Sequence, residues 1–463
     1  MATDSPQAST SPHVVIVGGG FAGLHAARRF GRAGYRVTLL DKRNFHLFQP
    51  LLYQVATGSL TIGDIAYPQR SVLRKLGNVR TLNTTVFDVD PKARVVYHEH
   101  GSMQYDLLVA ATGVKHNYFG NDHWREHAPG LKTAEHAIQM RRRIFRAFEL
   151  AELTDDAVAR RRLLNFVVVG GGPTGVELAG ALGELTRKTM VRDFRSFNSR
   201  DARVVLLEGG PDILPVYPER LRDEARRHLA ALGVEVQTSA MVEDVDAQGV
   251  RVRRGDASER MEAATVLWAA GVRPSLFGEV LAEATGAPRD RGGRIQVAPD
   301  CSLPGHPEIF VIGDLAMLTD AAGRDVPGLA PAAIQQGRYI ADAVRRRDAG
   351  KPMKPFRYRD WGTMAVIGVN RAVGNLRGLK TSGMLAWFLW AFVHIRALID
   401  GEQRLRVFVN WLWKYFTRQM GDRLITGDPT HTQSLRDARL GRVPPPDNGS
   451  GQDSGDKAGR NVA

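Results

Sequence analysis

Two glycine-rich stretches decide the fold of this chain: VVIVGGGFAGLHAA at Val14–Ala27 and FVVVGGGPTGVELAG at Phe166–Gly180. In each stretch a run of β-branched and apolar residues is followed by glycines and then by a helical pattern. This order predicts a buried strand, a tight turn and a helix, built twice. We therefore predict an α/β protein with two Rossmann-like dinucleotide-binding domains.

Both loops carry the spacing Gly-x-Gly-x-x-Gly. The first glycine permits a tight turn, the second lets the backbone approach a pyrophosphate, and the third permits close packing of helix against strand. The free N–H groups of the helix N-terminus then face the phosphates. The residues assigned to the two dinucleotides are Gly18, Gly19, Gly20, Phe21, Ala22 and Gly23 in the first loop, and Gly170, Gly172, Pro173, Thr174 and Gly175 in the second.

An acidic residue ends the strand that follows each loop. Asp41 ends YRVTLLD and Glu208 ends ARVVLLE, where a carboxylate accepts hydrogen bonds from ribose hydroxyls. Because a carboxylate repels a 2′-phosphate, Glu208 predicts NADH rather than NADPH. Two cradles in one chain indicate a resident flavin and a visiting nicotinamide. The FAD is expected in the N-terminal unit, because only this unit is completed by a distant segment. That segment is EIFVIGDLA at Glu308–Ala316, and its Asp314 is expected to bind the ribitol of the flavin.

Composition limits the functional classes. Lys and Arg total 63 against 49 Asp and Glu, a formal net charge of +14, which favours lipid headgroups or nucleic acid as a partner, unless it reflects a basic proteome. No nucleic-acid motif accompanies the charge, so lipid is preferred and no nucleic acid is expected. The single cysteine, Cys301, excludes a disulfide or a cysteine pair within the chain, and it is expected to be structural. No metal site is expected.

The chain divides into six predicted segments. "YDLLVAATG" and "ATVLWAAG" occupy equivalent places in the two units, which indicates a duplication at domain scale. The segments are a disordered leader (1–12), an FAD-binding domain (13–125), an NADH-binding domain (126–290), the second part of the FAD-binding domain (291–350), a C-terminal membrane-binding region (351–430) and a disordered tail (431–463).

Longer stretches resemble a known family. NFHLFQPLLYQVATG (Asn44–Gly58) and SGMLAWFLWAFVHI (Ser382–Ile395), together with the glycine loops and FVIGDLA, are similar to the type II NADH dehydrogenases. These are single-chain, non-proton-pumping NADH:quinone oxidoreductases. The resemblance covers Pro12 to Thr426, and it implies FAD, NADH, a membrane quinone (menaquinone or ubiquinone) and a homodimer lying on the membrane.

The resemblance also implies site residues. The family's quinone motif, Ala-Gln-x-Ala-x-Gln, reads Ala330–Gln335 here, with Pro331 in place of the first glutamine. Glu177 matches a family glutamate near flavin and nicotinamide, and we expect Glu177, Gln335 and Gln336 on the quinone side. Glu177 can equally be a carboxylate stabilised by a helix dipole, and Gln335 a helix-surface amide. The remaining assignments are Lys42, His46, Thr112, Gly113 and Ala333 to FAD, with a structural histidine as the alternative for His46, and Ala270 and Gly271 to NADH.

Four of the seven tryptophans lie between Trp387 and Trp413. The apolar run MLAWFLWAFV is ten residues long, too short to span a membrane. Leu405, Phe408, Leu412 and Phe416 recur at helical spacing. The pattern predicts two amphipathic helices over Trp387–Phe416, with tryptophan at headgroup depth and Lys and Arg on anionic lipid; the alternative is a helix pair in the core or a dimer interface. We expect a peripheral protein on the cytoplasmic face of the cell membrane.

Two other functions stay open beside NADH:quinone oxidoreduction. The first is a soluble NADH-dependent flavoprotein reductase of a small electron-carrier protein. The second is an interaction or signalling protein whose flavin is structural. Disulfide reductases, NADH peroxidases and sulfide:quinone reductases are disfavoured, because they need cysteine near the flavin and Asn44–Gly58 contains none.

Overall fold

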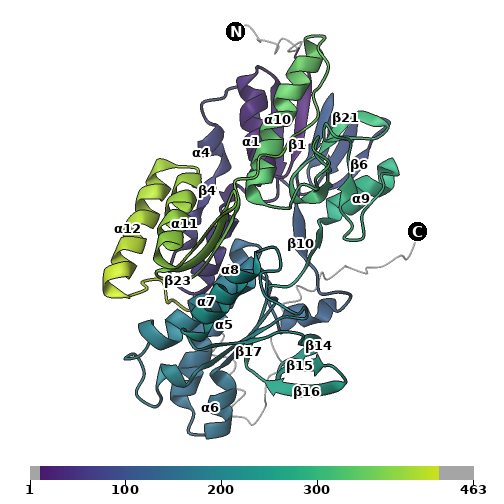
Figure 1. The fold of residues 1–463 in the computed structure, drawn as a ribbon. Helices are drawn as coiled ribbons and strands as arrows, with labels where there is room; N and C mark the ends of the chain where they lie inside the picture. The colour runs from purple at the N-terminus through teal and green to yellow at the C-terminus, as the bar shows by residue number, and fades with distance from the viewer. Residues whose placement is uncertain (1–10, 427–463) are drawn as a thin grey trace, which may run out of the picture. The chain divides into compact units, whose positions relative to one another are not determined.

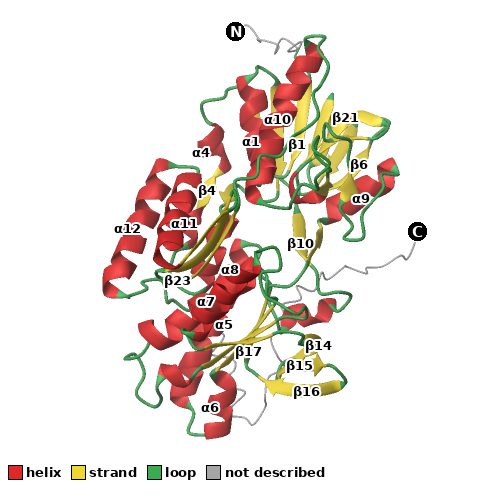
Figure 2. Ribbon diagram, viewed as in Figure 1, coloured by secondary structure: helices red, strands yellow, loops and turns green. Residues whose placement is uncertain are grey.

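The computed structural model, which describes residues 11–426, contains two largely parallel β-sheets, each with β1 or β11 at its centre (Figures 1 and 2). In the first sheet the strands are ordered β20 (Ser302–Leu303), β21 (His306–Val311), β9 (Leu107–Ala110), β1 (His13–Val17), β2 (Arg36–Asp41) and β5 (Val79–Asn83). In the second the order is β13 (Val234–Gln237), β12 (Arg203–Leu207), β11 (Asn165–Val169) and β17 (Thr265–Trp268). The predicted duplication is therefore present in the strand pairing.

The two glycine loops have the same backbone geometry. Gly18 and Gly170 have φ of +100° and +110°, a region that side chains disfavour. A Cβ on Gly23 would lie 1.8 Å from the carbonyl oxygen of Gly18, and a Cβ on Gly175 would lie 1.8 Å from that of Gly170. The first and third glycines are thus required for the turn and for the approach of α1 (Phe21–Arg32) and α7 (Pro173–Glu184) to their sheets.

The distant segment joins the first unit, as expected from its sequence. Helix α10 (Ala330–Asp348) packs along α1, where a Cβ on Gly337 would meet the carbonyl oxygen of Ala22 at 2.2 Å. An ion pair between Arg29 and Asp342, at 2.8 Å, joins the two helices across 313 residues of sequence. The helix N-terminus of α10 is therefore brought to the same unit as the first glycine loop.

The chain returns to the first unit earlier than the predicted boundary at residue 290. Strand β18 (Val272–Pro274) pairs with β10 (Val114–His116) in a two-stranded link, and α9 (Leu276–Thr285) follows it. Phe277 and Leu281 of α9 are buried in one cluster with Val15 and Val17 of β1. The apolar face of α9 thus belongs to the first core, and the return occurs at β18.

The smaller sheets are not predicted by the sequence pattern. Each unit carries a three-stranded antiparallel sheet, β6 (Val86–Asp90), β7 (Val95–His98) and β8 (Gly101–Gln104) in the first and β14 (Met241–Asp246), β15 (Gly249–Arg254) and β16 (Ala257–Glu262) in the second. The other helices and strands are β3 (Phe45–Leu47), α2 (Leu52–Ala56), α3 (Ile62–Ile65), β4 (Ala66–Pro68), α4 (Gln69–Leu73), α5 (Ala134–Leu153), α6 (Ala157–Leu163), α8 (Glu219–Ala230), β19 (Ile295–Gln296) and β22 (Ala316–Met317).

The C-terminal region consists of an antiparallel sheet and the two expected helices. The sheet contains β23 (Thr363–Gly368), β24 (Arg371–Leu376) and β25 (Leu379–Ser382), and α11 (Gly383–Ala397) and α12 (Gly401–Thr417) follow. Strand β23 packs on α7. No helix within residues 11–426 is long and apolar enough to cross a membrane. The tail from 431 and the leader up to residue 10 lie outside the described residues.

The expected position of the tryptophans is wrong for two of them. Trp390 and Trp411 are only 2% and 8% exposed and belong to a core cluster with residues of α2 and α7. Their rings stack, with centroids 4.9 Å apart. Trp413 is 64% exposed. One face of the helix pair is therefore part of the core, as the alternative interpretation expects. The other face is exposed, as the interpretation of interfacial helices requires.

Candidate active site

The first glycine loop is open where a pyrophosphate would bind. Helix α1 has Gly20 as its N-cap residue, with no side-chain cap and no acidic residue in its first turn. A Cβ on Gly20 would meet no atom within 4 Å. Asp41 accepts the Gly19 N–H and, at 2.7 Å, the Arg43 N–H. Burial raises the pKa of the Asp41 carboxyl, and these backbone donors oppose that effect.

The second loop repeats this arrangement. Helix α7 has Gly172 as its N-cap residue, again without a side-chain cap or an acidic residue in its first turn. A Cβ on Gly172 would meet no atom within 4 Å. Glu208 accepts the N–H groups of Gly171 and Gly210, both at 2.6 Å. Uncapped N–H groups facing free space are what a dinucleotide pyrophosphate requires. Both loops therefore fit dinucleotides, and a side chain at either middle glycine would fill the space.

The Glu208 carboxylate gives a testable prediction about nucleotide choice. In Glu208→Ala the ribose loses an acceptor and a 2′-phosphate loses its repulsion. We expect the KM for NADH to rise about tenfold and the preference for NADH over NADPH to narrow, measured as the ratio of the two kcat/KM values. Glu235→Ala is the matched control, because Glu235 pairs with Arg203 on an exposed part of the same unit. An unchanged ratio in Glu208→Ala would reject the assignment of this loop.

The distant segment completes the first loop. Asp314 lies in the turn after β21, 3.6 Å from the ammonium of Lys132. Gln336 accepts the Gly313 N–H at 2.6 Å and so holds this turn against α10. The Oγ1 of Thr112 is 2.6 Å from the Oγ of Ser275. Ala333 is buried beside the Gly313 turn. Gly113 and Gly271 both have positive φ. These glycines end the segments YDLLVAATG and ATVLWAAG, which occupy equivalent places in the two units.

Gln335 and Gln336 do not line the pocket that contains Glu177. The Gln335 amide donates to the Arg359 carbonyl oxygen and accepts the Arg359 N–H, both at 3.0 Å. Gln336 is 2% exposed and is engaged with Gly313. The two glutamines are therefore not on the side of the pocket where the quinone was expected. Their side-chain amides form hydrogen bonds with backbone groups of Arg359 and Gly313 instead.

His46 is placed against the first loop. Its Nδ1–H donates to the Gly19 carbonyl oxygen at 3.3 Å, and its ring packs edge-on against Phe21 with centroids 4.9 Å apart. Burial lowers the pKa of His46 to about 4. The histidine is therefore neutral at pH 7 and supports the loop, which favours the structural interpretation. Lys42 is exposed.

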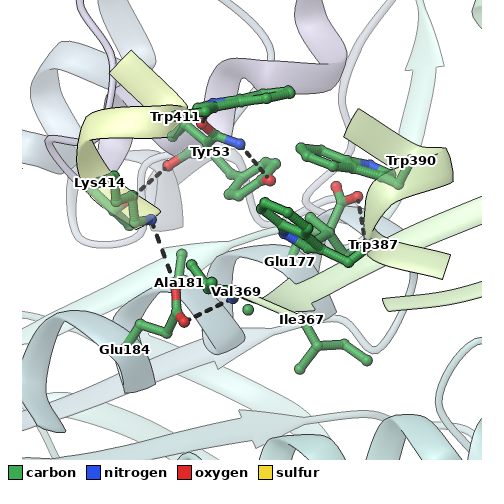
Figure 3. Close-up of a pocket in the computed structure, with 14 residues that line it drawn as sticks. Tyr53, Glu177, Ala181, Glu184, Ile367, Val369, Trp387, Trp390, Trp411 and Lys414 are labelled. Carbon is green, nitrogen blue, oxygen red and sulfur yellow. Dashed lines mark hydrogen bonds and ion pairs between the residues drawn. The ribbon is translucent and has the colours of Figure 1, made fainter. Parts of the chain in front are cut away.

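A pocket lies where the two units meet the C-terminal helices (Figure 3). It is lined from α2 by Tyr53 and Gln54, from α7 by Glu177 and Glu184, and from β23 and the C-terminal helices by apolar and aromatic side chains. An aromatic-walled pocket with a few polar groups suits a flat aromatic ligand.

Glu177 is the weakly paired carboxylate in this pocket. Its carboxylate accepts the Val366 N–H at 3.4 Å. Burial raises the pKa of Glu177 to about 8, which that hydrogen bond only partly offsets. The carboxyl therefore carries a proton at neutral pH, beside the second glycine loop and against β23. A group of this kind can hold or supply a proton at pH 7.

Glu184 and its partners were not predicted from the sequence. Glu184 accepts the Val369 N–H at 2.7 Å and lies 3.6 Å from the ammonium of Lys414. This contact joins α7 to α12. The signal that could have found it is the spacing from Glu177, because residues seven apart lie on one face of a helix.

Tyr53, Gln54 and the stacked tryptophans were also missed as pocket residues. Gln54 donates to the Tyr53 hydroxyl and accepts the Trp411 indole N–H, both at 2.8 Å. Both α2 residues lie within Asn44–Gly58, the stretch on which the resemblance rests. Trp411, the partner of Gln54, is 357 residues away, so no local pattern reveals that contact.

Comparisons with known proteins agree with this architecture. The pyridine nucleotide-disulphide oxidoreductase family matches residues 12–337, and the NDH2 C-terminal domain matches residues 361–419. The type II NADH:quinone oxidoreductase Ndh of Mycobacterium tuberculosis is 42% identical over 421 residues, which cover 89% of this chain and 90% of that protein. This chain belongs to the type II NADH:quinone oxidoreductases. A family member from Staphylococcus haemolyticus is 30% identical, over 83% of this chain and 94% of that protein.

Solved structures share the fold. NDH2 from Plasmodium falciparum, in complex with NADH, superposes with a TM-score of 0.83 at 18% identity, over 90% of this chain and all of that one. The sulfide:quinone oxidoreductase of Aquifex aeolicus gives a TM-score of 0.66 at 18% identity, over 93% and 96% of the two chains. The sole cysteine here, Cys301, is buried in the first core, where burial raises the pKa of its thiol. This type II oxidoreductase thus has no cysteine pair within its chain.

Proposed function

We propose that this chain oxidises NADH through a bound FAD and reduces a membrane quinone in the pocket around Glu177. The observation that carries this proposal is the pocket itself. It joins Glu177, two residues beyond the second glycine loop, to an aromatic wall from α11 and α12. The names of the relatives support the same reaction, since they are type II NADH:quinone oxidoreductases.

The chain's own groups act by binding, positioning and proton supply. FAD, when bound, accepts a hydride from NADH and passes two electrons onward. The first loop, Asp41 and the α10 N-terminus are assigned to hold it, and the second loop with Glu208 to align NADH. Reduction of a quinone to a quinol adds two electrons and two hydrogens. The hydride of NADH supplies both electrons and one of these hydrogens. We assign the other, as a proton, to the Glu177 carboxyl, which the buried site keeps protonated near neutral pH and which regains its proton from water.

We also propose that the protein lies peripherally on the cytoplasmic face of the membrane, through an apolar face of α11 and α12. A quinone tail resides in lipid, so its ring must reach the pocket from the bilayer. The two helices pack together, and large apolar side chains on them are 46–75% exposed. The apolar face consists of Met384, Leu385, Phe388, Phe392, Val393, Leu405, Phe408, Val409, Leu412, Trp413 and Phe416. Such a surface is typical of interfacial helices.

A charge on the apolar face is expected to release the protein from lipid. In Phe392→Glu with Phe416→Glu, two side chains that are 67% and 75% exposed become anionic. We expect co-flotation with vesicles of phosphatidylglycerol and phosphatidylcholine to fall at least fivefold, because each buried aromatic side chain contributes about 1.5–3 kcal/mol. Leu153→Glu is the matched control, since Leu153 of α5 is 79% exposed and lies outside the apolar face. Equal flotation of all proteins would refute this attachment.

The same double variant separates the enzyme from a soluble carrier reductase. Deleting Trp387–Phe416 would not, because Trp390 and Trp411 are part of the core. A soluble reductase keeps full turnover with its natural acceptor when the apolar face is charged. A quinone reductase on the membrane loses turnover with quinone embedded in vesicles and keeps it with a short-chain quinone in solution.

A homodimer is part of this proposal. It rests on the family resemblance, and its test is the mass of the detergent-free protein by light scattering. A value twice the chain mass supports the dimer, and the chain mass itself would contradict it.

A further inference from the structure

One polar group in the pocket has no partner. The indole N–H of Trp390 has no hydrogen-bond acceptor among residues 11–426, although the side chain is only 2% exposed. A buried donor without an acceptor destabilises a protein unless a ligand or water completes it. Trp390 lines the same pocket as Glu177.

The neighbouring polar groups are already engaged. The N–H of Trp411, the ring stacked on Trp390, donates to Gln54 at 2.8 Å. Glu184 is shared among the Val369 N–H, Lys414 and Lys188. The Trp390 N–H is therefore the donor of this wall that meets no acceptor among the described residues.

The Trp390 ring is held rigidly. It stacks on Trp411, and its other neighbour is the His394 ring, with centroids 4.5 Å away. The Nδ1–H of His394 donates to the Trp390 carbonyl oxygen at 2.8 Å. Figure 3 shows the rings of Tyr53, Trp387 and Trp390 around the Glu177 carboxyl group. A donor fixed in such a wall is preorganised for a flat ligand that carries an acceptor.

We propose that the Trp390 indole N–H donates a hydrogen bond to one carbonyl oxygen of the bound quinone. The inference rests on the proposed function and names a further binding residue for that site. An indole is a donor without an accessible deprotonated form, so Trp390 orients the carbonyl and gives up no proton.

The test is Trp390→Phe, which retains an aromatic ring and removes the donor. On FAD-loaded enzyme without NADH, isothermal titration with a naphthoquinone carrying one isoprenoid unit is expected to give a Kd about tenfold weaker. The infrared carbonyl band of the bound quinone should move to higher frequency, because a hydrogen bond lowers it. Flavin reduction by NADH should be unchanged. Replacing Trp390 with 3-benzothienylalanine, in which sulfur replaces N–H at nearly the same volume, gives the same result if the phenylalanine variant folds poorly.

Trp124→Phe is the matched control. It also removes an indole N–H from a buried tryptophan, but Trp124 lies in another core cluster, does not line this pocket, and donates its N–H to Asp244 at 3.1 Å. We expect a lower melting temperature and a quinone Kd within about twofold of the parent enzyme.

Three results would overturn the inference. An unchanged quinone Kd and carbonyl band in both Trp390 variants would leave the N–H without a role in quinone binding. Loss of FAD with unchanged quinone affinity would assign the N–H to the flavin. If the parent enzyme transfers no electrons from reduced flavin to quinone, the proposed function fails first and this inference fails with it.

Discussion

Replacing Gly20 with valine is expected to give a folded protein that is purified without FAD. A Cβ at Gly20 meets no protein atom within 4 Å, and its backbone is extended, with φ of −68° and ψ of −162°. The added Cβ therefore meets no protein atom, and the side chain that extends from it occupies the space assigned to the pyrophosphate. We expect flavin absorbance per protein to fall to a few per cent of the parent value, with an unchanged far-ultraviolet circular dichroism spectrum.

Gly172→Val is the matched variant in the second loop. Its backbone is likewise extended and its Cβ direction is free of protein atoms. It should retain FAD, yet the rate of flavin bleaching by NADH should fall at least 100-fold, because the nicotinamide nucleotide can no longer dock. Retention of FAD in Gly20→Val would contradict the assignment of the first loop to FAD. Loss of FAD in Gly172→Val alone would place FAD in the second loop instead.

Substituting Glu177 with glutamine is expected to slow flavin reoxidation by quinone about 100-fold at pH 7, with little effect on flavin reduction by NADH. Burial raises the pKa of Glu177 to about 8, so the carboxyl carries a transferable proton below that pH. Reoxidation in the parent enzyme should therefore fall as the pH rises through about 8. The amide cannot titrate, and the variant's rate should be flat across this range in stopped-flow measurements.

The same substitution, which is expected to slow catalysis, is expected to increase stability at high pH. The unfolded carboxyl ionises near pH 4.5 and the folded one near pH 8, so the buried acid destabilises the fold progressively between these values and most above pH 8. Glu177→Gln removes this penalty. Its melting temperature should exceed that of the parent at pH 9 and approach it at pH 5. Equal slowing of both half-reactions, or an unchanged pH profile, would contradict the assigned role.

The sequence predicts the nucleotide loops well because their determinants are local. The turn at Gly18, the packing at Gly23 and the acid at Asp41 lie within one strand–helix–strand unit, and the second loop repeats it. Steric exclusion of side chains acts over a few residues, so a short pattern suffices. The exposed positions at Leu405, Phe408, Leu412 and Phe416 also follow from helical spacing.

The pocket could not be predicted, because contacts distant in sequence create it. Trp411 meets Gln54 across 357 residues, and nothing local distinguishes a tryptophan facing the core from one facing lipid. Gln335 appeared functional from its motif, but its amide is satisfied by Arg359, a loop residue without periodicity. The boundary at residue 290 failed for the same reason, since only the packing of α9 shows which core its apolar face joins.

In the proposed reaction, one chain accepts electrons from NADH and delivers them to quinone through a single bound flavin. Anaerobic stopped-flow spectroscopy tests this transfer directly, with one equivalent of NADH mixed first and one equivalent of short-chain quinone second. We expect bleaching of the flavin band after the first addition and full recovery after the second. A flavin that stays oxidised with NADH, or a reduced flavin that quinone does not reoxidise, would contradict it.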